Sequence, residues 1–385
     1  MSLALILFWL SIFLLFYTYV LFTMLLVIRS LLRPIPYKKE PITPPVSLII
    51  AAYNEAEGIE KKLKNILTMD YPAGQFEAII ASDGSDDGTN EIVARYAAEH
   101  DIIKLLELPR QGKAGALNDA IATASGEILV FSDANSQYAT DAIRVIVQPF
   151  ADATIGGVAG NQRYIKGDTP ADNVGETGYW SFDRILKTLE SQGGNVISAT
   201  GAIYAIRRSL FQGVPEGVTD DFVTSTRVIA QGYRLVFEPD AVAFEPTAQS
   251  QTKEFGRKVR IMTRGLTAVV EMRELLNPFR HKFYALQLFT HKVLRRLMYI
   301  PLIVILIANP FLWNTHVFYQ LTMLAQIGFY GLAILGWLAG KMGIKLPKVL
   351  NIPAYFCMVY LAALLASWNV VRGHRINRWS TARQS

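Results

Sequence analysis

The stretch ILVFSDANSQY (Ile128–Tyr138) joins an apolar strand pattern to a polar turn. After its apolar residues, Asp133 and Asn135 follow with only Ala134 between them. In extended chain, residues two apart point to the same side, so these two side chains can face one ion. Asp and Asn are also common in turns and at helix starts. The stretch alone therefore leaves two interpretations open, a metal site or a turn in which Asp133 or Asn135 caps the following helix.

Strand and helix patterns alternate around this stretch. The predicted strands are Val46–Ala52, Phe76–Ser82, Ile102–Leu106 and Glu127–Ser132. The predicted helices are Glu55–Leu67, Thr89–Glu99 and Ala114–Ala124. Near-continuous apolar strands separated by amphipathic helices predict a mostly parallel sheet that is covered on both faces. The sequence therefore predicts an α/β, Rossmann-like domain over residues 41–279.

Three predicted strands end in acidic segments. The first strand leads to Glu55, the second to Asp83 and the fourth to Asp133. Parallel sheets bind ligands at the carboxyl ends of their strands, so three carboxylates there predict a binding site. The chain has neither a GxGxxG loop after the first strand nor a GxxxxGK[ST] loop, which disfavours a dinucleotide-dependent dehydrogenase and an ATPase.

Long apolar runs flank this domain. Leu3–Ile28 is a charge-free run of about 26 residues, more than the roughly 20 that cross a bilayer, and it lacks the features of a cleaved signal peptide. We expect a transmembrane helix at 1–28, an interfacial amphipathic helix at 280–296 and about three spans within 297–371. The three later runs are Leu297–Trp313, Val317–Leu338 and Ile352–Val371.

Basic residues beside the apolar runs predict the orientation. Arg29, Arg33, Lys38 and Lys39 follow the first run, which places the central domain in the cytoplasm of a multi-pass protein of the inner or plasma membrane. Three further spans would leave the C-terminus outside, whereas the basic tail, 372–385, favours the inside. One of the later runs is therefore expected to be re-entrant or interfacial.

Composition excludes several kinds of site. The formal net charge is +6, but much of the basic excess lies beside membrane segments, which indicates contact with phospholipid headgroups and not with nucleic acid. The single cysteine, Cys357, lies in the last apolar run. An intramolecular disulfide and a cysteine zinc cluster are excluded, and a catalytic thiol is disfavoured.

Six motifs occur in the order typical of family 2 glycosyltransferases. They are AAYNE (51–55), SDGSDDGT (82–89), GKAGALN (112–118), FSDANS (131–136), TGAIYAIRR (200–208) and VTDDF (218–222). On these motifs the chain resembles the membrane-embedded members of the family, such as cellulose, chitin and hyaluronan synthases and bacterial exopolysaccharide glycosyltransferases. The resemblance implies a GT-A-like fold, a UDP-sugar donor and inversion at the anomeric carbon by direct displacement.

The resemblance also implies roles in donor binding. Asp83 matches the residue that contacts the uracil and the ribose, with Tyr53 and Glu55 beside it. Lys113 matches the cation that meets the donor diphosphate; a solvated surface lysine is the alternative. The family's last motif, QxxRW, departs here, but Arg260 and Arg264 in the corresponding stretch suit oxygen pairs of the diphosphate.

The departure from the QxxRW motif affects the expected binding of the acceptor sugar. Arg257 stands in place of the motif's glutamine and Ile261 in place of its tryptophan, so an aromatic platform for the acceptor sugar is missing. Processive polymer synthesis is therefore in doubt. The basic residues of this stretch also fit a helix at the membrane surface.

The metal interpretation of the opening stretch is favoured by the resemblance. Asp133 matches the first position of a DxD metal site, and Asn135 stands where many relatives have a second aspartate. The implied ion is Mg²⁺ or Mn²⁺. Magnesium binds through one or two carboxylates together with substrate phosphates, so one aspartate with a diphosphate suffices, and metal binding without donor is expected to be weak.

The base and the acceptor site are implied in the same way. Asp221 matches the last residue of a TED-like motif, which makes it the general base, and Asp220 replaces the glutamate. The alternative is that these acids cap the helix Phe222–Ala230. Thr200, Gly201 and Asp220 are candidate acceptor-site residues.

The predicted function is transfer of a sugar from a UDP-sugar to a polysaccharide or lipid-linked acceptor. Four membrane segments are fewer than we expect for a self-sufficient polymer channel, which favours a secretion partner or a homo-oligomer. Two alternatives remain: a nucleotidyltransferase, whose glycine-rich signature is absent from the first strand end, and a membrane protein that binds nucleotide sugars without turnover.

Overall fold

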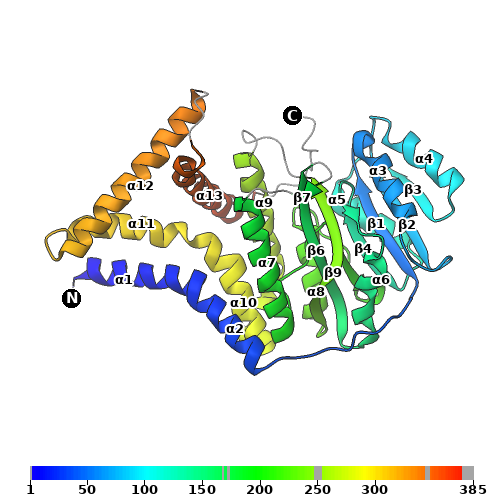
Figure 1. Cartoon of the computed structure of the whole chain (residues 1–385), viewed down its shortest axis with the longest axis horizontal. Coiled ribbons are helices and arrows are strands. Elements are labelled where there is room, and N and C mark those ends of the chain that lie inside the picture. The colour runs from blue at the N-terminus through cyan, green and yellow to red at the C-terminus, as the bar shows by residue number, and fades with distance from the viewer. Residues whose placement is uncertain (1, 167–168, 171–173, 247–253, 343–346, 375–385) are drawn as a thin grey trace. The chain divides into compact units, whose positions relative to one another are not determined.

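The computed structural model describes residues 2–166, 169–170, 174–246, 254–342 and 347–374 of the chain (Figure 1). The chain divides into two compact units. Of the described residues, one unit comprises 2–25, 254–270, 286–342 and 347–374, and the other comprises 26–166, 169–170, 174–246 and 271–285. Residues 254–270, predicted within the 41–279 domain, thus cluster with the terminal helices. Of the predicted basic tail, residues 375–385 lie outside the described part of the chain.

The larger unit is built on one sheet. Its strand order is β3-β2-β1-β4-β8-β6-β9-β5, with β7 paired to β6. The strands are β1 (Val46–Ala52), β2 (Phe76–Asp83), β3 (Ile103–Leu108), β4 (Ile128–Asp133), β5 (Gln137–Tyr138), β6 (Ile155–Lys166), β7 (Thr169–Pro170), β8 (Tyr204–Arg207) and β9 (Arg234–Pro246). The first four in spatial order are parallel, whereas β8 runs antiparallel to both β4 and β6. The predicted mostly parallel α/β sheet is therefore confirmed, with antiparallel pairs added beyond β4.

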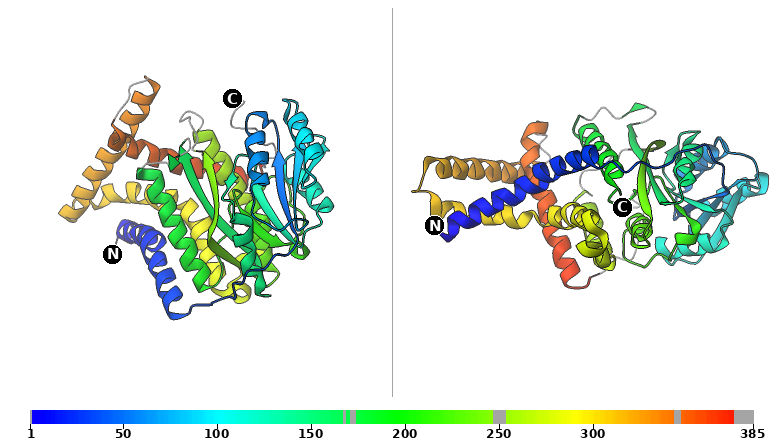
Figure 2. Two further views of the ribbon diagram at one scale, coloured as in Figure 1. Left: turned by 45° about the vertical axis from the view of Figure 1, so that its right-hand side comes forward. Right: turned by 90° about the horizontal axis from the view of Figure 1, so that it is seen from below.

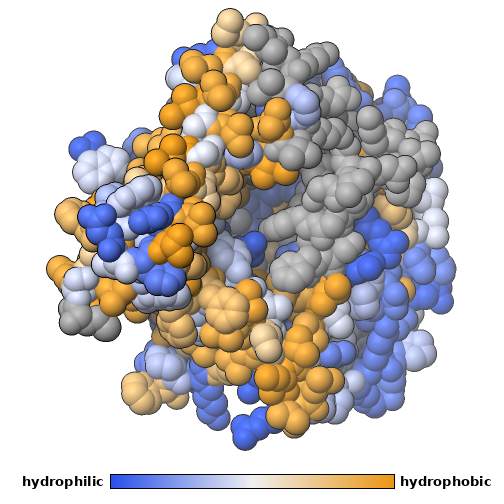
Figure 3. Space-filling view, turned by 60° about the vertical axis from the view of Figure 1, so that its left-hand side comes forward, coloured by the Kyte–Doolittle hydropathy of each residue, from blue (hydrophilic) through white to orange (hydrophobic). Residues whose placement is uncertain are grey.

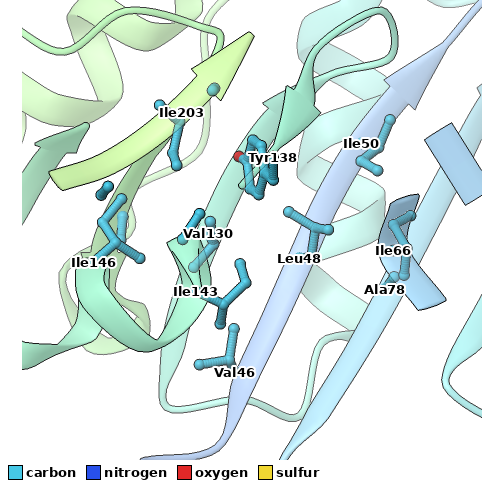
Figure 4. Packing of buried hydrophobic residues seen from close by; sticks show 14 of the residues in the cluster. Val46, Leu48, Ile50, Ile66, Ala78, Val130, Tyr138, Ile143, Ile146 and Ile203 are labelled. Atoms are coloured by element: carbon cyan, nitrogen blue, oxygen red, sulfur yellow. The ribbon is translucent and has the colours of Figure 1, made fainter. Parts of the chain in front are cut away.

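Helices cover both faces of the sheet, as Figure 2 shows from two further sides. They are α3 (Ala56–Leu67), α4 (Thr89–Glu99), α5 (Lys113–Thr123), α6 (Ala142–Val147), α7 (Val174–Gly193) and α8 (Asp220–Ala230). Alternate residues of β1, Val46, Leu48 and Ile50, enter one buried cluster with residues of α3, α4 and α6 (Figure 4). The helix α5 contacts β1 and β2 and does not contribute to that cluster, so it covers the opposite face.

The other unit is helical. It contains α1 (Leu3–Phe16), most of α9 (Glu254–Glu271), α11 (Tyr299–Ala308), α12 (Val317–Lys341) and α13 (Lys348–Val371). Among the described residues, three helices are long and apolar enough to cross a membrane: Leu3–Leu32, Val317–Lys341 and Leu350–Val371. Many of their apolar side chains are exposed, and Figure 3 shows a broad apolar surface. Exposed apolar helices of this length suit a lipid environment.

The predicted span at 297–313 differs from the structure. The helix α11 has only 10 residues, which gives about 15 Å, half the thickness of a bilayer core. It is long and apolar enough to cross a membrane only together with the helical segment before it. The two segments, Pro278–Leu297 and Tyr299–Leu312, are bent by 49° relative to each other. The pair gives a fourth candidate span, broken or re-entrant.

The interfacial helix predicted at 280–296 is also not continuous. The helix α10 (Pro278–Leu288) is interrupted at Lys282, whose φ is 49° and ψ is −125°. A π-helical turn at Phe289–Val293 and a 3₁₀ turn at Leu294–Leu297 follow it. Changes of helix type of this kind bend a helix, which accounts for the difference.

Candidate active site

The loops after β1 and β2 are joined by hydrogen bonds. The Asn54 backbone has φ of 52°, a left-handed conformation that asparagine tolerates, and it turns the chain sharply after β1. The Asn54 amide donates to Asp86 Oδ1 at 2.8 Å, and the Asp86 N–H donates back to Asn54 Oδ1 at 3.0 Å. The Glu55 N–H donates to Thr89 Oγ1 at 2.9 Å. These contacts fix the segment that carries Tyr53 and Glu55, two of the predicted donor-binding residues.

The fully buried Asp83 anchors the loop before α5. Its carboxylate accepts from the Arg110 guanidinium and from the N–H groups of Gln111, at 2.7 Å, and Gly112, at 2.9 Å. The guanidinium carbon of Arg110 lies 3.4 Å from the centre of the Tyr53 ring. Asp83 and Tyr53 are thus brought together as predicted, but through Arg110, which our sequence reasoning missed. Its only signal was a basic residue just before the GKAGALN motif.

Lys113 joins two acidic segments of the chain. Its ammonium lies 2.8 Å from Asp133 Oδ1 and 3.0 Å from Asp220 Oδ2. Burial alone would lower the pKa of Lys113, but the charges of Asp133 and Asp220 raise it well above its usual value, so the side chain is a cation at any physiological pH. The surface-lysine interpretation is therefore wrong, because this lysine lies inside an acidic cluster.

The Gly201 backbone packs closely against the Asp133 carboxylate. A Cβ atom at Gly201 would lie 2.8 Å from Asp133 Oδ2, so any larger residue would push the carboxylate away. The neighbouring Thr200 Oγ1 is buried and has no hydrogen-bond partner within the described parts of the chain. A buried hydroxyl without a protein partner suits contact with a ligand. Both residues were predicted for the acceptor site, and in that role they remain predictions.

Asp221 lies in the first turn of α8, beside Asp220. Its Oδ1 accepts from the N–H of the next residue, Phe222, at 2.7 Å. Burial, followed by the charges of Asp220, Asp221 and Asp133, raises the pKa of Tyr204 well above its usual value. The charges of these three carboxylates therefore all act on one buried phenol, a residue that the sequence had not singled out. In the described segments the Thr219 side chain makes no capping hydrogen bond, but Asp220 and Asp221 both stand in the first turn of α8, so the interpretation as helix-start acids stays open beside the catalytic one.

The oxygen donors of Asp133 and Asn135 suit a hard cation only in part. The Asp133 side chain is 35% exposed and Asn135 is exposed, so both are accessible. Within the described residues no group of three His, Cys, Asp or Glu side chains forms a complete metal site. Such a donor set fits Mg²⁺ or Mn²⁺ that takes its remaining oxygens from a diphosphate.

The other predicted residues lie elsewhere. Arg260 and Arg264 lie on α9, in the helical unit, and burial together with the charges of Arg264 and Arg257 lowers the pKa of Arg260. Like charges gathered in this way favour an anion, but donor binding by this pair remains a prediction.

Comparison with known proteins identifies the central part of the chain. Residues 47–214 match the model of the family described as "Glycosyl transferase family 2". Poly-beta-1,6-N-acetyl-D-glucosamine synthase of Staphylococcus epidermidis is 29% identical over 205 residues, which are 52% of this chain and 49% of that protein. Beta-monoglucosyldiacylglycerol synthase of a Nostoc species is 32% identical over 205 residues, 51% of this chain and 44% of that protein. The chain thus spans about half the length of these relatives.

Among solved structures, a mannosyltransferase from Pyrobaculum calidifontis, in complex with GDP-Man and Mn²⁺, has a similar fold. The TM-score is 0.70 at 24% sequence identity, and the match covers 95% of this chain and 99% of that one. The predicted glycosyltransferase fold is confirmed.

Proposed function

We propose that this chain, whose residues 47–214 form a family 2 glycosyltransferase domain, is a membrane-integrated inverting glycosyltransferase that uses a UDP-sugar. The acceptor is a polysaccharide or a lipid-linked sugar. The observation that supports this most is the cluster in which Lys113 contacts both Asp133 and Asp220, next to Asp221. Cation and carboxylates lie at the carboxyl edge of a sheet where such folds bind nucleotides.

In this proposal the donor lies along the carboxyl ends of β1, β2 and β4. The Tyr53 ring with Arg110 supports stacking and polar contact with the nucleoside, and Asp83 holds Arg110 in place. The Lys113 ammonium is close enough to Asp133 to meet a diphosphate held there. Asp133 and Asn135 would hold a divalent ion, which when bound supplies positive charge against the departing diphosphate.

The chemical step assigns the base to Asp221. The acceptor hydroxyl attacks the anomeric carbon, its oxygen bonds to that carbon, and the bond from the carbon to the diphosphate oxygen breaks. Asp221 takes the proton of the hydroxyl, and the nucleoside diphosphate leaves with its electron pair. The single displacement inverts the anomeric centre. Lys113 offsets the negative charge that develops on the leaving diphosphate.

The acceptor and the location follow from the rest of the chain. One curated relative is named for a polysaccharide and another for a glycolipid, and both kinds of acceptor can reach an enzyme at a membrane surface. Three candidate spans, with a bent pair as a fourth, support a multi-pass protein. Basic residues at the end of the first span and directly after it, including Arg29 and Arg33, support a cytoplasmic catalytic domain.

The test is nucleotide release by the full chain in lipid nanodiscs, across a panel of UDP-sugars and GDP-sugars, with Mn²⁺, Mg²⁺ or a chelator. We expect release from one UDP-sugar, dependent on the ion. Release from GDP-sugars alone would contradict the donor assignment. Full release in the presence of chelator would contradict the metal assignment, and UDP binding without release from any donor would favour a binding protein.

A further inference from the structure

A lysine that the proposed reaction does not use is buried beneath the candidate metal loop. Lys62 lies on α3 and is 0% exposed. Its ammonium donates to Ser132 Oγ at 2.7 Å and to the Ser136 carbonyl oxygen at 2.7 Å. These two residues bracket Asp133 and Asn135, so a single side chain joins both ends of the loop.

Lys62 approaches the loop from the face of the sheet opposite to Lys113. Side chains alternate along β4, so Ser132 points toward the face covered by α3 and Asp133 toward the face covered by α5. Ser132 meets Lys62 on the first face, and Asp133 meets Lys113 on the second. The contact of Lys62 therefore leaves the Asp133 carboxylate available for a ligand.

The same helix holds the loop at a second point. Asn65, one turn after Lys62, donates to the Tyr138 carbonyl oxygen at 2.9 Å and accepts from the Tyr138 N–H at 2.7 Å. The Lys62 ammonium also lies 4.2 Å from the centre of the Tyr138 ring. Ser136 makes a further contact, because its hydroxyl donates to Glu245 Oε1 at 2.6 Å. The loop is fixed by side chains of α3 and β9 before any ligand arrives.

Stability alone does not account for this lysine. Tyr138 belongs to the apolar cluster seen in Figure 4, so the ammonium is buried beside apolar side chains. Burial lowers the pKa of Lys62 to about 7, although the charges of Asp133 and Glu245 act to raise it. The lowered pKa means that burial disfavours the charged form of Lys62 more than the two nearby carboxylates favour it. A lysine that is costly to bury and that donates hydrogen bonds to both ends of the loop fits a role in positioning that loop.

We infer that Lys62 is a positioning residue that fixes the Ser132–Ser136 loop so that Asp133 can bind a divalent ion together with the donor diphosphate. The inference rests on the proposed function of Asp133. It assigns to a residue outside the motifs a role in metal binding, without direct contact with the ion.

The test compares Lys62→Met with Lys61→Met, a matched change at an exposed position of the same helix. The full chain in nanodiscs is titrated with Mn²⁺ at fixed UDP, and the rise in Tm is recorded; Mn²⁺-dependent turnover is measured in parallel. We expect Lys62→Met to lower the ligand-free Tm, because the buried Ser136 carbonyl loses its ammonium donor, and to need at least tenfold more Mn²⁺ for half of each response. Lys61→Met should match the natural protein.

A second variant keeps the test decisive if Lys62→Met does not fold. Ser132→Ala removes one of the two acceptors, and we expect it to raise the half-saturating Mn²⁺ concentration by about threefold, in line with one lost hydrogen bond. Because both changes act on one contact, the double variant should be no worse than Lys62→Met alone.

The inference is overturned if the folded variants need the same or less Mn²⁺ than the natural protein, or if turnover falls equally at every Mn²⁺ concentration. Asp133→Asn is the control that should not respond to Mn²⁺ with UDP. If the natural protein also shows no response, the proposed function is overturned, and the inference with it.

Discussion

The Lys113 ammonium lies 2.8 Å from Asp133 Oδ1, so the predicted donor-binding cation is paired with the predicted metal ligand in the ligand-free protein. Its second contact, to Asp220, makes it the cation between two acidic segments. A positive charge in this place competes with a metal ion for Asp133. Ion binding and the position of Lys113 are therefore linked.

This relationship predicts opposite effects of Lys113→Met on binding and on turnover. Without the ammonium, Asp133 and Asp220 lack their counter-charge, so we expect tighter Mn²⁺ binding in the absence of nucleotide. Turnover should fall by about 10²- to 10³-fold because a charge that stabilises the leaving diphosphate is lost. Mn²⁺ binding is followed by electron paramagnetic resonance of the free ion, and Lys64→Met, at an exposed position, is the control. Unchanged or weaker Mn²⁺ binding would show that Lys113 does not compete with the ion.

The anchoring role of Asp83 is tested by Asp83→Asn. The change leaves the partly buried Arg110 without its carboxylate and weakens the hold on Gln111 and Gly112, so we expect a loss of about 2 kcal/mol in the free energy of unfolding. The KM for the donor should rise at least tenfold, because Arg110 no longer rests on Tyr53. Asp101→Asn, at an exposed position in the turn before β3, should change both quantities much less. An unchanged KM in the Asp83 variant would count against a nucleoside site at Tyr53 and Arg110.

Glu77, near the start of β2, lies at the edge of the sheet opposite to the candidate site, and it predicts that stability depends on pH. Burial alone would raise the pKa of Glu77, but hydrogen bonds from Lys104, Ser47 and Ser125 lower it to about 2. Because the folded-state pKa lies below the usual value, this carboxylate stabilises the fold above about pH 4.5, and the contribution is lost as the pH falls toward 2. Glu77→Gln should therefore lower the free energy of unfolding by about 2 kcal/mol at pH 6.

The measurement for Glu77 is denaturant unfolding of both proteins between pH 6 and pH 2.5, followed by tryptophan fluorescence. The difference between them should shrink steadily with acid. A difference that is constant over this range would mean that the Glu77 charge contributes nothing.

Much of the fold could be predicted because local signals and tertiary environment agree. The strand Val46–Ala52 and the helix Thr89–Glu99 have the predicted bounds, since one is apolar throughout and the other has a clear amphipathic pattern between turn residues. The parallel order also follows from the alternation of strands and helices. The membrane-proximal segments were predicted less well, because changes of helix type such as those at 289–297 leave no simple periodicity.

Only some residues of the candidate site could be predicted from the sequence. Asp133 and Asp220 belong to motifs, and the structure brings both to Lys113. Lys62 lies in the stretch EKKLKN, where several lysines suggest a solvated surface, and only its contacts with Ser132 and Ser136 distinguish it. Arg110 was missed for a similar reason: the contact that gives it a role comes from a residue 27 positions away in the chain.

The central claim is that Asp221 removes the proton of the acceptor hydroxyl, and its most direct test is sugar transfer by Asp221→Asn. The variant is measured beside Asp240→Asn, an exposed acid on β9, with the donor and the ion that the natural protein uses. We predict that Asp221→Asn keeps its fold and its affinity for UDP but loses transfer by about 10³-fold, while Asp240→Asn retains it. Transfer within a few fold of the natural rate in a well-folded Asp221→Asn protein would contradict the account.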